Sequence, residues 1–173
     1  MACVRVFGVT MRLVTDKGFE AFFRAEYRSL VALGAAMTGS TEAGQDLAQE
    51  AFARAFQQWV KVEALERPGA WVRRVLINLA IDNNRRRVRE RTVLGRLSHD
   101  EVLISNDAGS DEWWCAVRAL PDRQRAAVAL YYLEDMSVLE VAWVLDVAAG
   151  TVKASLAKAR VTLSNTLREV KAS

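Results

Sequence analysis

The chain has 173 residues, of which 51% are hydrophobic, and it carries a formal net charge of +3. This length allows one domain or two small ones, and the apolar fraction is sufficient for their cores. Two widely separated cysteines and a single histidine exclude a disulfide scaffold and a zinc finger. No segment approaches the roughly 20 apolar residues of a membrane span, so we predict a cytoplasmic protein without membrane insertion.

Composition also predicts the fold class. Only two prolines and nine glycines interrupt long stretches rich in Ala, Leu, Val, Arg and Glu. This mixture favours helices and offers few turn signals for a sheet, so we predict an all-α chain.

Charge is distributed unevenly along the chain. Residues 1–91 carry 15 Lys and Arg against 10 Asp and Glu, whereas residues 92–111 carry one Arg against four acids. From residue 150 onward there are five basic residues against one acid. Two basic regions on either side of an acidic segment indicate a polyanionic partner that is contacted at two places.

Two amphipathic helices are predicted after a disordered tail at residues 1–15. Apolar residues recur at spacings of three and four from Phe19 to Met37, as in a helix with one buried face. Ser40 or Thr41 is a suitable N-cap for the second helix. The buried face of this second helix carries Leu47, Ala51, Phe52, Ala55, Phe56 and Trp59. Its polar face carries Asp46, Gln49, Glu50, Ala53 and Gln57.

A third helix is predicted from Ala70, after a loop over residues 60–69, and it ends in five arginines within residues 85–91. Such a stretch suits a solvated face, a membrane surface or a nucleic acid. Its purely polar end disfavours the membrane. Seven arginines against two acids in residues 71–91 favour nucleic acid. For base edges and stacking, the neighbouring candidates are Asn83, Asn84, Trp59 and Trp71.

Residues 92–111 are rich in turn formers and predict an acidic flexible linker. Four helices are predicted beyond it, at residues 113–120, 121–136, 138–145 and from about 149 onward. Pro121 suits the first position of the second of these, and Ser137 with Glu140 forms a capping box before the third. We therefore predict two small helical domains, at residues 16–91 and 112–173, joined by the linker at 92–111.

The last two helices have the form of a helix-turn-helix, whose second helix can enter a major groove. An ordinary antiparallel helix pair is the alternative at this point. No catalytic site is evident, because His99 has no nucleophile motif nearby and no glycine-rich phosphate loop occurs. Asp46 and Glu50 are better explained as helix-surface acids than as metal ligands. We therefore predict no enzyme activity, no metal and no cofactor.

Four segments together resemble the extracytoplasmic-function sigma factors of bacterial RNA polymerase. They read DLAQEAFARAFQQW (46–59), PGAWVRRVLINLAIDNNRRR (68–87), LPDRQRAAVALYYLEDMSVLEVAWVL (120–145) and GTVKASLAKAR (150–160). The resemblance covers about residues 19–168, and the composition is similar to that of actinobacterial proteins. It implies a sigma-2 helical bundle followed by a sigma-4 helix-turn-helix domain.

The resemblance also implies partners and sites. The second helix would bind the clamp coiled coil of the largest polymerase subunit through Asp46, Gln49, Glu50, Arg54 and Gln57. The third would recognise and melt the minus-10 promoter element through Trp71, Arg73, Arg74, Asn78, Asp82, Asn83, Arg86 and Arg87, while loop 60–68 receives a flipped base of the non-template strand. The last helix would read the duplex minus-35 element through Thr151, Lys153, Ala154, Ser155, Ala157 and Lys158. The sigma-4 surface would meet the polymerase flap, and an anti-sigma factor is a further implied partner.

Two positions depart from the family pattern. Asp146 stands where the turn of the helix-turn-helix usually has glycine, and since Asp tolerates the left-handed conformation we expect the turn to survive. Ser155 and Ala157 replace an arginine and a histidine of the usual recognition helix, which leaves fewer donors for base edges. Two alternative functions therefore stay open: a helix-turn-helix regulator that works without polymerase, and a degenerate sigma homologue that acts only through protein partners.

Overall fold

The computed structural model describes residues 17–93 and 112–172, and within them all regular secondary structure is helical. The first unit contains α1 (Lys17–Thr38), α2 (Thr41–Gln57), α3 (Trp59–Glu63) and α4 (Pro68–Val93). The second contains α5 (Glu112–Arg118), α6 (Asp122–Val128), η1 (Ala129–Leu133), α7 (Val138–Leu145) and α8 (Ala149–Ala172). The predicted all-α class is confirmed. The predicted tail and nearly all of the predicted linker lie outside the described residues.

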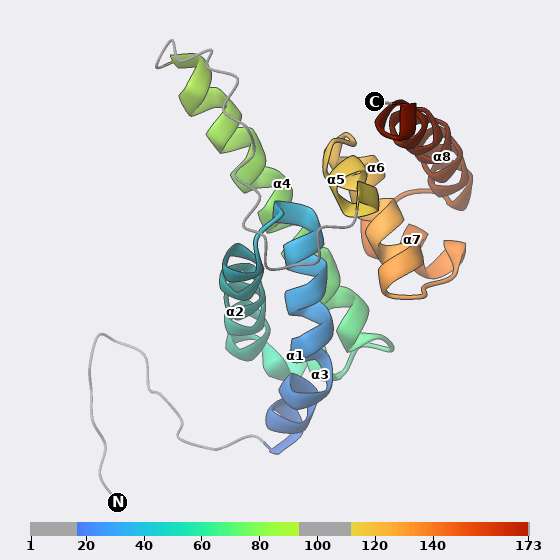
Figure 1. The fold of residues 1–173 in the computed structure, drawn as a ribbon. Helices are drawn as coiled ribbons and strands as arrows, with labels where there is room; N and C mark the ends of the chain where they lie inside the picture. The colour runs from blue at the N-terminus through green and yellow to red at the C-terminus, as the bar shows by residue number, and fades with distance from the viewer. Residues whose placement is uncertain (1–16, 94–111, 173) are drawn as a thin grey trace, which may run out of the picture.

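In the first unit, α1, α2 and α4 pack side by side (Figure 1). Their apolar stripes meet in a core that contains Leu30, Leu33, Phe52 and Leu76. The predicted start of α2 is confirmed, because the Ser40 side chain accepts a hydrogen bond from the Ala43 N–H at 3.3 Å. This cap satisfies one of the backbone donors that a helix leaves unpaired at its N-terminus.

Two sequence-based expectations for residues 56–69 were wrong. Trp59 is only 6% exposed and packs between Phe19 and Phe22, with ring centroids 5.2 and 5.0 Å away. Its burial in the core was predicted from helix periodicity, whereas the expected stacking on a base was wrong, because the ring offers no free face. Residues 59–63 form the short helix α3 in place of a loop. Aromatic packing explains both results, because burying the Trp59 ring fixes this segment against α1.

Helix α4 changes character along its length, as the sequence predicted. Val72, Leu76, Ile77 and Ala80 are buried in the first half. In the second half, residues 85–90 are all exposed. Figure 1 shows this half extending beyond α1 and α2. The apolar half is held by the bundle, and the arginine-rich half is exposed to solvent.

The second unit differs from the prediction at one helix. Residues 121–136 were expected to form a single helix, but α6 passes into the π-helical turn η1, and Asp135 has a left-handed φ of 51°. Pro121 was predicted to be the first helical residue, but it is the N-cap of α6, whose first residue is Asp122. Because η1 ends at Leu133, the next residue, Glu134, lies at a change of chain direction, where its side chain reaches the first unit.

The buried apolar residues of both units form one connected cluster. Contacts between the units run from α1 to α5, α6 and η1, and from α4 to α7. The two units are therefore packed against each other over several helices. Within the described residues, no helix is both long and apolar enough to cross a bilayer.

Helices α1 and α2 approach closely at a pair of glycines, which generates a prediction. A Cβ atom added to Gly44 would lie 2.6 Å from the Ala35 nitrogen, whereas one added to Gly150 would meet nothing within 4 Å. We expect Gly44→Ala to lower the free energy of unfolding by about 1–3 kcal/mol, because the added methyl group forces the backbones of α1 and α2 apart. Gly150→Ala, the matched control, should raise it by up to about 1 kcal/mol through helix propensity. Urea denaturation measures both, and equal effects would contradict the close approach.

Candidate nucleic-acid interface

Helices α7 and α8 form a helix-turn-helix whose boundaries match those predicted. The Ser137 hydroxyl accepts from the Glu140 N–H at 3.3 Å, and the Glu140 carboxylate accepts from the Ser137 N–H at 2.9 Å. Hydrogen bonds to Ser137 lower the pKa of Glu140. This is the predicted capping box. Asp146 closes α7 with φ 55° and ψ 51°, so the turn survives in the left-handed conformation as expected.

Helix α8 buries one stripe and exposes another. Val152, Leu156, Ala159 and Leu163 are buried against the rest of the unit. All but one of the predicted minus-35 residues are exposed, namely Thr151, Lys153, Ala154, Ala157 and Lys158, and Ser155 is half-buried. The helix therefore presents a surface of small and basic side chains, as recognition of a groove requires.

A groove of about 620 Å³ separates α2 from the second half of α4. Its α2 side carries Asp46 and Glu50, and its α4 side carries Asn83, Arg86 and Arg87. Among the residues that the structure describes, Arg86 pairs with Glu90 in the next turn, at 2.9 Å, and its side chain is 78% exposed. An exposed ion pair of this kind contributes little to stability, so a phosphate can readily replace Glu90 as the partner of Arg86. The groove places acidic and basic candidate residues on neighbouring helices.

The polar face of α2 is open along its whole length. All five predicted clamp-binding residues are exposed: Asp46, Gln49, Glu50, Arg54 and Gln57. Arg54 donates to Glu50 at 2.8 Å within the helix. Nothing else in the described residues covers this face, which leaves it available to a protein partner.

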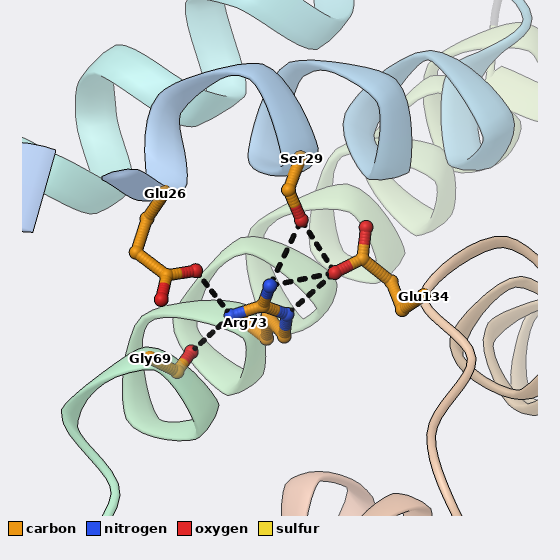
Figure 2. A network of polar contacts seen from close by, with 5 residues as sticks. All are labelled: Glu26, Ser29, Gly69, Arg73 and Glu134. Carbon is orange, nitrogen blue, oxygen red and sulfur yellow. Dashed lines mark hydrogen bonds and ion pairs between the residues drawn. The ribbon is translucent and has the colours of Figure 1, made fainter. Parts of the chain in front are cut away.

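Arg73 occupies a different environment from the exposed arginines. Figure 2 shows its guanidinium between α1, the start of α4 and Glu134 of the second unit. It lies 2.6 Å from a carboxylate oxygen of Glu26 and 2.6 Å from one of Glu134. It also donates to the Ser29 hydroxyl at 2.8 Å and to the Gly69 carbonyl at 3.1 Å. Every edge of this guanidinium is used inside the protein.

Burial and charge act in opposite directions on Arg73. Burial by itself disfavours the charged form, but the carboxylates of Glu134 and Glu26 outweigh it and raise the pKa of Arg73. Only 13% of the Arg73 side chain and 5% of the Glu134 side chain are exposed. The Ser29 hydroxyl donates to the same Glu134 oxygen at 2.5 Å, so the buried carboxylate is hydrogen-bonded as well as paired.

Arg74 is also bound by the second unit. Its guanidinium lies 4.8 Å from the ring centroid of Trp143, in cation–π geometry, and donates to the Val144 carbonyl at 3.1 Å and to the Trp143 carbonyl. Asn84, a sequence-based candidate for base contacts, donates to Asp122 of α6 at 2.8 Å. The sequence predicted DNA contacts for Arg73, Arg74 and Asn84. In the structure these three side chains hold the two units together.

Two more predicted residues face the helix-turn-helix. Asn78 and Asp82 of α4 line a cavity of about 260 Å³ whose opposite wall includes Thr151 and Ser155 of α8. The structure thus brings predicted minus-10 and minus-35 residues to one place. Trp71, by contrast, is half-buried against the core and stands apart from this cavity. In the part of the chain that the structure describes, no group of three His, Cys, Asp or Glu residues is arranged to hold a metal ion.

Comparison with known proteins identifies the two units. Residues 22–90 match the family described as Sigma-70 region 2, and residues 110–163 match Sigma-70, region 4. The chain is 31% identical over 143 residues to the RNA polymerase sigma-E factor of Streptomyces antibioticus, which covers 82% of this chain and 79% of that protein. It is 27% identical over 150 residues to the ECF RNA polymerase sigma factor SigW of Bacillus subtilis, covering 78% and 80%. The chain belongs to the ECF sigma factors.

A solved structure supports the fold of this sigma factor. The sigma factor RpoE of Bartonella quintana, in complex with the anti-sigma factor NepR, superposes with a TM-score of 0.75 at 22% identity. The likeness covers 88% of this chain and 98% of that one, so it includes both helical units. The first unit is accordingly called region 2 below, and the second region 4.

Asp146 provides a test of the helix-turn-helix turn. Since only glycine occupies the left-handed region without a steric penalty, Asp146→Gly should raise the free energy of unfolding by about 0.5–1 kcal/mol. Asp146→Val should lower it by about 1–2 kcal/mol, because a β-branched side chain is strained there. Both variants lose the weak contact with Arg74, at 3.9 Å, so their difference reports the backbone alone. Equal stabilities in urea denaturation would contradict the observed turn.

Proposed function

We propose that this sigma factor directs promoter-specific initiation by binding core polymerase through α2 and promoter DNA through α4 and α8. The observation that carries the proposal is the groove between α2 and α4, where an exposed polar helix face adjoins exposed arginines. Protein and DNA can then be bound side by side on one domain. The sigma factor itself carries out no catalytic step in this account, and it works in the cytoplasm, where polymerase is.

Docking on polymerase is assigned to the clamp coiled coil and the flap. The exposed face of α2, through Asp46, Gln49, Glu50, Arg54 and Gln57, suits a polar coiled coil. The exposed apolar side chains Leu139 and Trp143 of α7 suit the flap, because large apolar groups left in solvent mark protein interfaces. An anti-sigma factor is a further proposed partner, supported by the complex in which a sigma factor of this fold was solved. An actinobacterial source stays a prediction, because the relatives also include a Bacillus protein.

Minus-10 recognition is assigned to α4 and the segment before it. Arg86 and Arg87 are exposed and suit phosphates, and Asn83 lies in the same groove and suits a base edge. Val60 is 83% exposed next to Lys61, which fits capture of an unstacked base near residues 60–68. Binding the opened strand in preference to duplex shifts the melting equilibrium, so differential affinity opens the promoter. Trp71, Arg73, Arg74, Asn78 and Asp82 are the remaining proposed contacts on this helix.

Minus-35 recognition is assigned to α8. Lys153 and Lys158 are exposed and suit phosphates, while the methyl groups of Thr151, Ala154 and Ala157 suit thymine methyls. Ser155 supplies a short hydroxyl donor. Because long side chains are few on this helix, the shape of the DNA contributes more of the specificity than hydrogen bonds to bases do.

Run-off transcription with purified core polymerase tests the proposal. Arg86→Glu combined with Arg87→Glu should reduce open-complex formation by about tenfold or more, because two phosphate contacts become repulsive. The binding constant K for promoter DNA falls as salt concentration rises. Each lost phosphate contact should make the slope of log K against log salt concentration shallower by about 0.7 to 0.9.

The matched control is Arg24→Glu with Arg28→Glu, which makes the same charge change on an exposed face of α1. It should leave initiation near the wild-type level. Intact cellular function of the Arg86 and Arg87 variant would favour a sigma homologue that acts only through protein partners. Tight, specific duplex binding in a gel shift without polymerase would favour the polymerase-independent regulator.

A further inference from the structure

The cavity between α4 and the helix-turn-helix has an apolar floor and a polar rim. Ile77 of α4, Val144 of α7 and Val152 of α8 line it and are at most 2% exposed. Polar side chains from α4, α6 and α8 surround this floor, and all of them except Ser155 are exposed. The volume of about 260 Å³ lies just below the range of about 300–1,000 Å³ that is usual for ligand pockets. An apolar surface with a few polar groups around it is typical of a site for a small molecule.

Two arginines on the rim of this cavity are not used inside the protein. Arg85 comes from α4 and Arg123 from α6. Neither guanidinium forms an ion pair or a hydrogen bond with any residue that the structure describes. Asn84 donates to Asp122 at 2.8 Å, which brings the start of α6 next to the Arg85 end of the cavity. Because arginine binds phosphate and carboxylate groups bidentately, two unpaired guanidiniums at one end of a cavity indicate an anionic ligand.

The polar groups farther along the cavity suit the uncharged part of such a ligand. Asn78 precedes Arg85 by two turns of α4, which is about 10 Å along the axis at a rise of about 1.5 Å per residue. Its amide offers a donor and an acceptor, the combination that recognises an adenine edge. Asp82 lies between these two residues, and Thr151 lies on the opposite wall. A carboxylate and a hydroxyl can both accept hydrogen bonds from the hydroxyl groups of a sugar.

We propose that this cavity binds a purine nucleoside monophosphate, whose phosphate is held by Arg85 and Arg123 and whose base lies beside Asn78. The flat ring covers the apolar floor at Ile77 and Val152, and burial of its surface favours binding. A cavity at the small end of the usual range suits one nucleotide better than a chain of them. The site goes beyond the function proposed above, because neither polymerase nor promoter DNA takes part in this binding.

Isothermal titration calorimetry of the full chain with AMP, adenosine and inorganic phosphate tests the site. AMP uses both ends of the cavity, so it should bind more tightly than adenosine or phosphate by about tenfold or more. Arg123→Ala should weaken AMP binding by about tenfold, because a charge-assisted contact to the phosphate is lost. The same substitution should leave the affinity for adenosine unchanged.

Asn78→Ala examines the opposite end of the cavity, and it should weaken the binding of adenosine and AMP but not that of phosphate. Arg89→Ala is the matched control for Arg123→Ala, because it removes the same charge from an exposed position that does not line the cavity. This control should bind AMP as the wild-type chain does. Circular dichroism checks that each variant keeps its helices.

Three results would overturn the nucleotide site: AMP that binds no more tightly than inorganic phosphate, equal weakening by Arg123→Ala and Arg89→Ala, or no binding of AMP at all. A short single-stranded oligonucleotide that binds more tightly than AMP and loses affinity in Arg123→Ala would also overturn it, because the cavity would then belong to the promoter strand. Failure of the proposed function would instead appear as absence of promoter-dependent transcription by the wild-type chain with core polymerase. The two failures are therefore distinguishable.

Discussion

The Arg73 guanidinium is the contact on which the arrangement of this sigma factor depends. It joins α1 through Glu26 and Ser29, the start of α4 through the Gly69 carbonyl, and region 4 through Glu134. Removing one partner of a buried ion pair costs about 3–5 kcal/mol, because the other charge is left without compensation. With 13% and 5% exposure, Arg73 and Glu134 come close to that case. One side chain thus links three segments of the two units, which also share a connected apolar core.

Local signals made much of the fold predictable. Apolar spacing predicted the long helices, and Ser40, Ser137 and Asp146 act at the helix ends as expected, because a cap depends on residues only a few positions away. The short helix α3 and the interruption of the helix at η1 depend on packing between distant segments. Periodicity carries no information about such packing, so both were missed.

The candidate site was likewise predictable only where it depends on local sequence pattern. Exposure of Arg86, Arg87 and the polar face of α2 follows from helix periodicity and agrees with the sequence-based expectation. Arg73 and Glu134 are 61 residues apart, and no local pattern links them. A charge count treats all seven arginines of residues 71–91 alike. The structure separates the enclosed Arg73 and the partly enclosed Arg74, which join the two units, from the exposed arginines.

The central claim is that Arg73 and its partners hold region 4 against region 2 in the free chain. Fluorescence energy transfer tests it, with dyes on cysteines replacing the exposed Glu42 and Ala119 in a chain whose own cysteines are changed to serine. These positions flank the place where Gly39 meets Arg118, so the dyes are close when the domains are closed. We predict high transfer in the free chain and lower transfer in Glu134→Lys, which places a second cation against Arg73. Low transfer in the free chain, or transfer that is unchanged in Glu134→Lys, would contradict the account.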